Sequence, residues 1–488
     1  MTPNSQPQVD PRFTDPAAEI YQQKRVRHWD DVAHGSAKFH GFGGLYKRRL
    51  TRLYRFLIPE GQRVLELGCG KGDLLAALNP SRGVGVDFSN GMIALASERH
   101  PDLQWHRMDV HDLSTLQEKF DFIILSDLIN DLWDVQIALQ QLRPLCTSGT
   151  RIILNFYSHL WEFPLTAAQK LKLATHRLEQ NWLTTEDLVN LLHLAGFESM
   201  RNWQEMIWPL PFPLLEPFCN RFLARFWPFK EFALANFVIA RPCLPRQDNP
   251  PSVSVVIPAR NEAGNIPAIF ERTPAMGAFT ELIFVEGHSK DDTVSAIQRE
   301  IASHPGQRSK FLQQTGVGKA DAVRLGFSQA TGDILMILDA DLTVPPEDLP
   351  RFYDALFTNK GEFINGVRLV YPMESQAMRS FNLLGNKFFS LAFSWLLGQP
   401  LKDTLCGTKV LWRTDYEKIA ANRSYFGDFD PFGDYDLIFG AAKLNLKITD
   451  LPIRYRERTY GTTNIQRWKH GWLLLRMVWF AARRLKFI

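Results

Sequence analysis

The sequence predicts an α/β protein of two domains, each built on a parallel β-sheet with helices on both faces. Three observations lead to this fold class. Short β-branched runs alternate with segments of helical periodicity in both halves of the chain. The length of 488 residues exceeds that of a typical single domain. A segment with four prolines, ARPCLPRQDNPPS at 240–252, separates the two halves.

The domain boundaries follow from this proline-rich segment. We expect a first domain over 1–243 with a polar N-terminal tail, a linker over 244–251 and a second domain over 252–488. Ligands of such sheets bind at the carboxyl ends of the strands. The expected strands are 62–68, 83–88, 103–109, 120–127 and 150–158 in the first domain, and 253–259, 281–287, 309–314, 333–341 and 361–369 in the second.

The bulk composition limits the function. A formal net charge of +4 gives no indication of nucleic-acid binding. The five cysteines are scattered and form no zinc motif or disulfide framework, which favours a reducing cytoplasmic compartment. The first twenty residues lack the pattern of a signal peptide. No stretch offers the roughly 18 uninterrupted apolar residues of a spanning helix, so we expect any membrane contact to be peripheral.

The first half carries a glycine loop between an expected strand and an expected helix, VLELGCGKGDLLAAL at 64–78. Glycines let a loop turn tightly and approach a ligand closely. Asp87 ends the next strand, where an acid suits the two hydroxyls of a ribose. The other residues of the pattern are Glu66, Gly68, Gly70 and Gly72 in the loop and its strand, and Asp109 after the third strand.

This pattern resembles class I S-adenosylmethionine-dependent methyltransferases over roughly residues 63–158. Its spacing differs from that of nicotinamide enzymes, which are the alternative. The resemblance implies that Gly68 and Gly70 approach the methionine end of S-adenosylmethionine. Asp87 would bind the ribose hydroxyls and Asp109 the adenine amine. Methyl transfer depends largely on the positioning of the two reactants, so no protein nucleophile is required.

The methyl acceptor is not identified by the sequence. Asp127, Asn130 and Asp131 follow the fourth strand and are candidates either to contact an acceptor or to cap a helix. Residues 203–237 are dense in Trp, Phe and Pro. They form a hydrophobic cover over the acceptor, a membrane-facing surface or an internal packing segment.

The second half contains two aspartates, Asp339 and Asp341, at the end of the apolar run DILMILDAD. Alternation along a strand puts both carboxylates on one side of the chain, where they repel one another unless a cation lies between them. Mg²⁺ or Mn²⁺, bound by oxygen ligands and bridging a diphosphate, meets that need.

Together with three upstream segments, this motif resembles family 2 glycosyltransferases of the GT-A fold. Those segments are a strand and loop at 253–266, a strand ending on Glu286 and a Gly/Lys loop at 316–327. The resemblance implies a nucleotide-sugar donor and a mixed sheet of the nucleotide-diphospho-sugar transferase type. Glu286 stands where the family usually has an aspartate. The implied donor-binding residues are Pro258, Arg260, Glu262, Glu286, Lys319, Asp321 and Asp339, with Asp339 and Asp341 as metal ligands.

Residues 383–464 resemble dolichol-phosphate and polyprenyl-phosphate glycosyltransferases, which implies a lipid-phosphate acceptor. An R-x-x-G-x-[ST] element begins at Arg458, but Asn464 replaces the lysine usually expected next. The implied partners of the acceptor phosphate are Arg413, Arg456 and Arg458. A phosphate acceptor needs no general base, whereas an alcohol acceptor would give its proton to one of the family's acidic pair, Asp434 or Asp436.

The C-terminal segment at 466–488 combines tryptophan with a basic stripe. On a helix, Trp468, Trp472 and Trp479 share a face, and Lys469, Arg476 and Arg483 recur every seven residues beside it. Tryptophan beside a basic stripe suits the headgroup region of a membrane. The alternative is a terminal helix docked on its own domain. We predict a cytoplasmic enzyme that is peripheral on the inner face of the cell membrane.

The combined prediction is a bifunctional glycosyltransferase and methyltransferase. One alternative is a glycosyltransferase whose first domain binds S-adenosylmethionine, or acts as a scaffold, without catalysis. Another is a methyltransferase with an inactive second domain.

Overall fold

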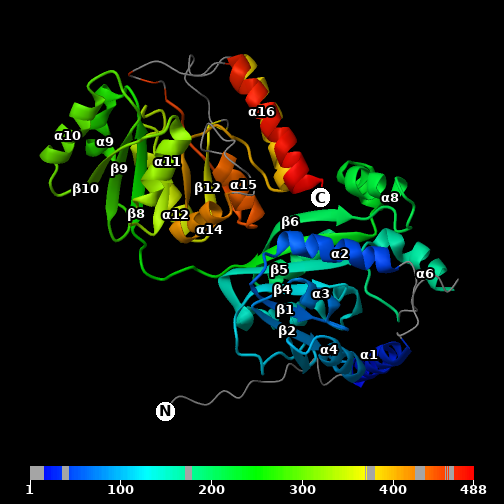
Figure 1. Ribbon diagram of the computed structural model, residues 1–488. Helices are drawn as coiled ribbons and strands as arrows, with labels where there is room; N and C mark the ends of the chain where they lie inside the picture. Colours follow the sequence, from blue (N-terminus) through cyan, green and yellow to red (C-terminus); the bar gives the residue numbers. More distant parts are fainter. Residues whose placement is uncertain are drawn as a thin grey trace, which may run out of the picture. The chain divides into compact units, whose positions relative to one another are not determined.

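The computed structural model describes residues 16–35, 43–170, 178–368, 370, 380–423, 435–456, 458, 460 and 467–487. The chain divides into two compact units, Met1–Leu244 and Pro245–Ile488 (Figure 1). Each unit contains one seven-stranded sheet with helices packed against it.

The sheet of the first unit has the order β3-β2-β1-β4-β5-β7-β6. Its first five strands in sequence are parallel, as predicted. The order reverses between β1 and β4, which is the switch point where open α/β sheets bind ligands. The last two strands were not predicted, and β7 runs antiparallel to both of its neighbours. The strands are β1 Arg63–Leu67, β2 Arg82–Asp87, β3 Gln104–Arg107, β4 Phe120–Ser126, β5 Cys146–Tyr157, β6 Phe197–Glu205 and β7 Ala235–Pro242.

Alternating strand residues divide the helices of this unit between two faces. Val64, Ile124 and Ile153 pack against one helical layer, whereas their neighbours Leu65 and Leu125 face the other. The first layer contains α2 Gly43–Leu57 and α3 Asp73–Ala77, and the second contains α5 Val135–Gln140 and α7 Thr185–Leu194. The remaining helices are α1 Pro16–Gly35, which packs on α4 Asn90–Arg99, and α6 Glu162–Lys170 and α8 Leu215–Pro217.

The sheet of the second unit is mixed, with the order β10-β9-β8-β11-β13-β12-β14. β13 runs antiparallel to β11 and β12, and the other pairs are parallel. The carboxyl ends of β8, β9, β11, β12 and β14 therefore meet at one edge, together with the start of β13. The strands are β8 Val253–Ala259, β9 Thr280–Glu286, β10 Arg308–Gln313, β11 Ile334–Ile337, β12 Phe363–Val367, β13 Lys409–Trp412 and β14 Ile448–Pro452.

Helices α9 Ile266–Arg272, α10 Thr293–Ser303 and α12 Leu349–Phe357 share one hydrophobic core with this sheet. On the other side of β8, α11 Lys319–Ser328 packs closely, because Gly326 lies against Val256. The remaining helices are α13 Ser380–Leu397, α14 Arg413–Ala421, α15 Tyr435–Lys443 and α16 Arg467–Ala481. Within the described residues, every helix is too short or too polar to cross a bilayer.

Candidate functional sites

The glycine loop of the first unit lies at the carboxyl end of β1, as predicted. Gly68, Gly70 and Gly72 have φ values of 68°, 52° and 75°, in the left-handed region that favours glycine. A Cβ on Gly72 would lie 2.8 Å from the Cζ2 of Trp105, so the loop also packs tightly against the β3 side chain. Both the left-handed backbone conformation and the packing against Trp105 therefore require glycine at position 72.

Two buried carboxyl groups hold the loop. Asp87 accepts hydrogen bonds from the backbone N–H groups of Gly70 and Ser89, both at 2.9 Å. Burial raises the pKa of Asp87 to about 6, although these two bonds oppose the rise. Glu66 accepts from the N–H of Leu75 at 3.1 Å, and burial raises its pKa to about 8. Each oxygen of Asp87 retains a second acceptor position, which can bind a ribose hydroxyl.

A pocket of about 430 Å³ adjoins Phe88, Met108 and Asp109, at the ends of β2 and β3. Its volume is in the range of small-molecule sites. The Asp109 carboxylate accepts from the His111 N–H at 2.8 Å and contacts the His111 ring at 2.6 Å. These contacts outweigh burial and lower the pKa of Asp109. An ionised carboxylate in a pocket that also has Val26, Phe88 and Met108 in its lining suits an adenine ring and its amine.

Helix α1 lines one side of this pocket, which the sequence did not indicate. Gln22 donates to Asp109, and Gln22, Val26 and Arg27 line the pocket. Asp30 accepts from the N–H of Gly91 at 2.9 Å and from the hydroxyl of Ser89. The predicted polar tail, the first twenty residues, thus overlaps helix α1, Pro16–Gly35, and the residues of α1 after the tail line the candidate cofactor site.

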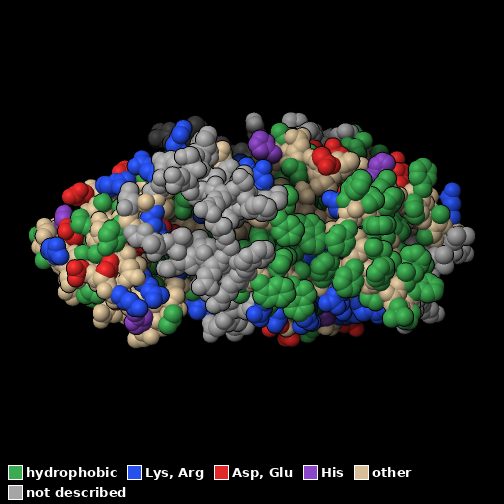
Figure 2. Space-filling model, turned by 90° about the horizontal axis from the view of Figure 1, so that it is seen from above, with side chains coloured by type: hydrophobic (Ala, Val, Ile, Leu, Met, Phe, Trp, Pro, Cys, Tyr) green, Lys and Arg blue, Asp and Glu red, His purple; other side chains and the backbone are tan. Residues whose placement is uncertain are grey.

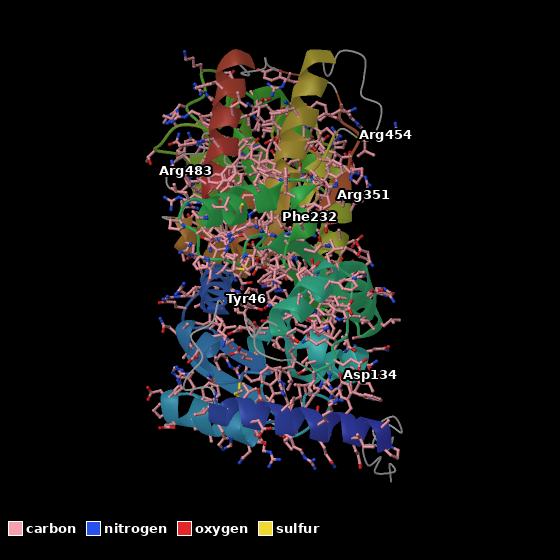
Figure 3. All side chains as sticks on the ribbon, turned by 90° about the vertical axis from the view of Figure 1, so that its right-hand side faces the viewer. Tyr46, Asp134, Phe232, Arg351, Arg454 and Arg483 are labelled. Atoms are coloured by element: carbon pink, nitrogen blue, oxygen red, sulfur yellow. The ribbon has the colours of Figure 1, made fainter. Side chains whose placement is uncertain are left out.

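Asp127 lies at the end of β4 with a φ of 55°, a conformation that is uncommon outside glycine. Tyr46, which Figure 3 labels on α2, donates to the Asp127 carboxylate at 2.7 Å, and the Asn155 amide donates at 2.6 Å. The Tyr157 hydroxyl donates to the same carboxylate at 3.0 Å. This group of hydroxyl, amide and carboxylate side chains is the candidate methyl-acceptor side of the site.

The other two acceptor candidates have structural partners. The Asn130 side chain donates to the carbonyl of Asn181 at 2.7 Å and accepts from the N–H of Tyr157 at 2.9 Å. Asp131 accepts from Arg25 and Trp29 of α1, each at 2.9 Å. Both residues fasten neighbouring segments to the loop that follows β4.

In the second unit, Asp339 and Asp341 follow β11 at the carboxyl edge of the sheet. The strand ends at Ile337, so strand alternation does not set the direction of the two carboxylates, contrary to the prediction. Asp339 pairs with the Lys319 ammonium at 2.6 Å. Burial alone would raise the pKa of Asp339, but Lys319 outweighs it and the pKa is lowered. Asp341 accepts from the Thr343 hydroxyl at 2.8 Å and from Arg458 at 2.6 Å.

Three residues at this edge were not among the predicted site residues. Gly407 packs directly against Asp339 and Lys319. Arg368, at the end of β12, makes a bidentate ion pair with buried Asp403 at 2.7 and 2.8 Å. Lys409, which is fully buried at the start of β13, donates to the Cys406 carbonyl. The turn at 403–407 lies within the segment 383–464, whose resemblance to polyprenyl-phosphate glycosyltransferases is visible in the sequence, whereas Arg368 lies outside that segment.

The ends of β8 and β9 supply the remaining predicted donor residues. Glu262 lies 3.5 Å from Arg458, and burial raises its pKa to about 7. Glu286 accepts from the N–H of Ser289 at 2.5 Å, and Asp321 from that of Gly316 at 3.2 Å. These carboxylates shape the loops around the edge. Pro258 and Arg260 lie on either side of the end of β8.

The predicted acceptor residues are only partly brought together. Arg458 lies in the site, because its guanidinium donates to Asp341. The backbone N–H of Arg456 donates to the Thr343 carbonyl at 3.0 Å. Arg413 lies elsewhere, because it follows β13 and its backbone binds Asp333 at the opposite end of β11. Asp436 accepts from Arg423 at 2.9 Å and lies 3.5 Å from Arg324. Asp434 is outside the described residues, as are Gly461, Thr463 and Asn464.

Within the described part of the chain, no group of three or more His, Cys, Asp or Glu side chains is arranged to hold a metal ion. A cation that completes its coordination with diphosphate oxygens and water needs only one or two protein carboxylates. The hard oxygens of Asp339 and Asp341 fit such a cation. Lys319 and Arg458 now neutralise these two carboxylates.

Comparisons with known proteins match the two units to different families. A model described as Glycosyl transferase family 2 matches residues 254–419. A model described as Methyltransferase domain matches residues 42–201.

Relatives of the chain include sugar transferases. The undecaprenyl-phosphate 4-deoxy-4-formamido-L-arabinose transferases of Pectobacterium atrosepticum and Pectobacterium carotovorum are 32% and 38% identical over 164 residues. The match covers 33% of this chain and 48% of each of those proteins, so the chain spans less than half of their length. Glycosyltransferase AglJ of Haloferax volcanii is 27% identical over 227 residues, which cover 46% of this chain and 70% of that protein.

Solved structures similar to the chain include a glucosyl-3-phosphoglycerate synthase from Mycobacterium tuberculosis in complex with Mn²⁺ and uridine diphosphate. It is 20% identical with a TM-score of 0.36, and the match covers 48% of this chain and 80% of that one. A S-adenosylmethionine-dependent methyltransferase from Thermotoga maritima is 19% identical with a TM-score of 0.34. That match covers 44% of this chain and 99% of the other.

Proposed function

We propose that this chain, which carries a methyltransferase domain and a family 2 glycosyltransferase domain, transfers a sugar from a nucleotide-sugar to a polyprenyl phosphate and a methyl group from S-adenosylmethionine to an acceptor that is not identified. The observation that carries the sugar-transfer proposal is the edge of the second sheet. There Asp339 pairs with Lys319, and Asp341 pairs with Arg458. Gly407 packs against Asp339 and Lys319. The names of the arabinose transferases support a polyprenyl-phosphate acceptor.

The donor binds along this edge, where Lys319 offers a positive charge to its diphosphate. The ends of β8 and β9, with Glu262 and Glu286, shape the loops for the nucleoside. Asp339 and Asp341 would hold the Mg²⁺ or Mn²⁺, which supplies charge neutralisation for the leaving diphosphate.

The acceptor phosphate approaches Arg458 and Arg456, because guanidinium groups bind phosphate in a bidentate manner. A phosphate oxygen attacks the anomeric carbon, and the bond from that carbon to the diphosphate breaks. The attacking oxygen is already anionic, so no residue has to accept a proton. The ion pairs of Asp436 with Arg423 and Arg324 favour this reaction over an alcohol acceptor, which would need Asp434 or Asp436 as a base.

The methyl donor binds at the first sheet, with Asp87 at the ribose and Asp109 at the adenine. S-adenosylmethionine supplies the electrophilic methyl group when bound. Asp127, with Tyr46 and Tyr157, positions a polar acceptor at the end of β4 and accepts its proton. A first domain that binds S-adenosylmethionine without catalysis is the alternative.

The enzyme works on the inner face of the membrane as a peripheral protein. Trp472 and Trp479 on α16 have exposed fractions of 67% and 62%. Arg476 and Arg483 on the same segment are exposed as well. Tryptophan beside basic residues suits the headgroup region.

Sugar transfer is tested with purified protein, Mg²⁺ or Mn²⁺, a panel of UDP- and GDP-sugars and polyprenyl phosphate in detergent. The product is a sugar-lipid detected by mass spectrometry of the organic phase. Asp341→Ala should abolish it, whereas Asp354→Ala, a change at an exposed aspartate on α12, should not. Donor turnover without a lipid product would reject the proposed acceptor.

Methyl transfer is tested in the same mixture with isotope-labelled S-adenosylmethionine. Label in the sugar-lipid would show that both reactions act on one molecule. Binding of S-adenosylhomocysteine with no labelled product from any lipid or sugar acceptor would favour the non-catalytic alternative.

A further inference from the structure

The segment between β6 and β7, residues 206–234, presents an apolar surface to solvent. Nine Phe, Leu and Trp side chains between 212 and 232 have exposed fractions of 41–87%, led by Leu214 at 87% and Trp227 at 77%. We call these side chains the apolar face. Phe163 of α6, exposed at 84%, adds to it, and Figure 2 shows hydrophobic side chains gathered on the right-hand part of the view, where α6 and α8 lie in Figure 1. Internal packing therefore does not describe these side chains, although Met206, Leu234 and Phe237 of the same stretch are buried.

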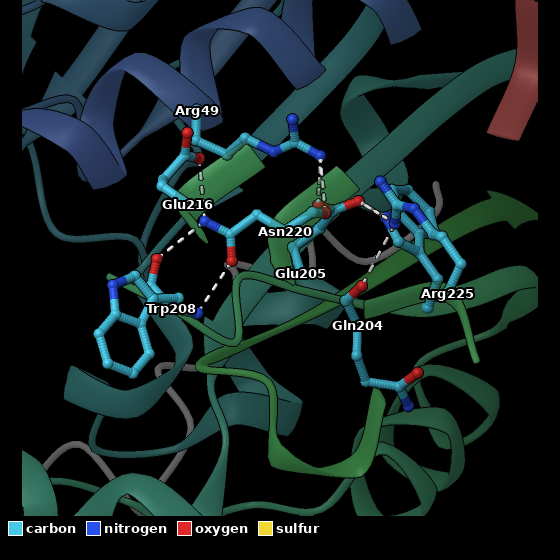
Figure 4. A network of polar contacts seen from close by, with 8 residues as sticks. Arg49, Gln204, Glu205, Trp208, Glu216, Asn220 and Arg225 are labelled. Atoms are coloured by element: carbon cyan, nitrogen blue, oxygen red, sulfur yellow. Dashed lines mark hydrogen bonds and ion pairs between the residues drawn. The ribbon is translucent and has the colours of Figure 1, made fainter. Parts of the chain in front are cut away.

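A buried polar network beneath the apolar face accounts for its outward direction (Figure 4). Glu205 is 1% exposed and accepts from Arg225 at 2.5 Å and from Arg49 of α2 at 3.2 Å. The Asn220 side chain binds both the N–H and the carbonyl of Trp208, at 2.9 and 2.8 Å. These polar groups occupy the side of the segment that faces the sheet and hold its backbone in place. The aromatic side chains of the segment therefore point away from the sheet.

The helix fastened to this network is strongly basic. α2, GGLYKRRLTRLYRFL, has five Lys and Arg residues and no Asp or Glu. Arg49 points inward, where it also contacts the Asn220 carbonyl at 3.4 Å. Lys47, Arg48, Arg52 and Arg55 are exposed. Figure 2 shows Lys and Arg side chains along the edge of the hydrophobic area.

The size of the apolar face calls for a partner. If each of the nine side chains offers about half of a typical aromatic area, the face measures roughly 1,000 Å². The largest apolar patch of an ordinary monomer is about 300–600 Å². Such a surface matches an anionic bilayer, because the aromatic side chains can enter the hydrocarbon boundary while the basic residues beside them contact the phosphate headgroups.

We propose that the apolar face and the exposed residues of α2 dock the methyltransferase unit onto a bilayer that contains anionic phospholipid. The docking surface continues to the acceptor side of the methyltransferase site. The Ser158 N–H, directly after Tyr157, binds the Leu234 carbonyl at 2.8 Å, and the Trp161 indole donates to the Phe232 carbonyl at 2.9 Å. Docking brings the Asp127 site to the membrane surface, so the methyl acceptor is itself membrane-bound. The docking itself goes beyond the proposed function and does not depend on sugar transfer, whereas the membrane-bound methyl acceptor rests on the proposed methyl transfer.

The test is flotation of the full-length protein with vesicles of phosphatidylcholine, with and without phosphatidylglycerol. Leu214→Ser/Trp227→Ser should lower partitioning by about tenfold or more, because both side chains lose apolar contact. Arg48→Gln/Arg52→Gln should lower it by about fivefold per residue, and only with phosphatidylglycerol. Leu194→Ser on α7, at the opposite face of the sheet, is the matched control and should bind as the wild type. Circular dichroism and melting temperature should stay unchanged, because the substituted side chains are exposed.

The same experiment in a Trp472→Ser/Trp479→Ser background separates this surface from α16. The changes to the apolar face should still lower partitioning in that background. Three results would overturn the proposal. The first is vesicle binding that the Trp472→Ser/Trp479→Ser changes abolish and the changes to the apolar face leave unaltered. The second is a Leu214→Ser/Trp227→Ser variant that loses self-association in sedimentation but binds vesicles normally. The third is the same variant with a changed radius of gyration and normal vesicle binding. The last two would assign the apolar face to a second copy or to another part of the chain.

Discussion

Gly407→Ala should block sugar transfer by displacing Asp339. A Cβ at this position would lie 2.6 Å from the Cγ of Asp339, and closer still to its carboxylate and to the Lys319 ammonium. An ordinary contact begins near 3.4 Å, so the carboxyl group must retreat by about 1 Å. A displacement of about 1 Å in a catalytic site can cost about 100-fold in rate. The backbone adds no strain, because Gly407 is not in the left-handed region.

The assay measures sugar transfer and the free energy of unfolding for the same variant. We expect a loss of about 100-fold in transfer and a destabilisation of about 1–3 kcal/mol, which is typical of overpacking. Gly306→Ala is the control, because a Cβ there would meet no atom within 4 Å. Transfer by Gly407→Ala at the rate of the Gly306→Ala control would refute the idea that Asp339 and Lys319 bind the donor.

Three further predictions concern the buried carboxyl groups. Asp403→Asn should lower the free energy of unfolding in urea by about 3–5 kcal/mol, since Arg368 would keep a buried charge without its partner; a cost below 1 kcal/mol would contradict this. Because burial raises the pKa of Glu66 from 4.5 to about 8, its stabilising contribution is complete below pH 4.5 and is lost as the pH rises toward 8. Glu66→Gln should remove that fall in stability, and an unchanged pH profile would argue against it. Asp87→Asn should weaken S-adenosylhomocysteine binding by about 10–100-fold in calorimetry, the value of a charge-assisted hydrogen bond; equal affinity would remove Asp87 from the ribose site.

The sequence was most informative where the chemistry is local. Gly72 and Asp87 follow strands whose β-branched runs are visible in the chain, and the parallel part of the first sheet brings their strand ends together. Glycine at a left-handed position and an acid after a buried strand are requirements of the backbone and of the ligand, so they can be read without a structure.

Long-range pairing was not visible in the sequence. β13 is antiparallel, so its start carries Lys409 to the edge beside Asp339 while its end carries Arg413 away from it. A motif of consecutive residues does not reveal which end of a strand faces the site. Arg368 and Asp403 are 35 residues apart, and only the sheet order makes them an ion pair.

The direction of the aromatic segment was likewise undecided. Residues 203–237 were compatible with a cover, a membrane surface or a core, because composition does not state what lies beneath a chain. The buried Glu205, Arg49 and Arg225 decide it, since a polar network on the inner side leaves the aromatic side chains outside.

The sequence by itself determined two α/β units, their order and the places of the glycine and carboxylate motifs at strand ends, because strand periodicity and loops after strands are encoded over a few residues. The tertiary structure decided which charges meet, such as Lys319 with Asp339 and Arg458 with Asp341. It also decided that α1 lines the candidate cofactor pocket. These outcomes depend on strand order, register and burial, which are properties of the whole fold.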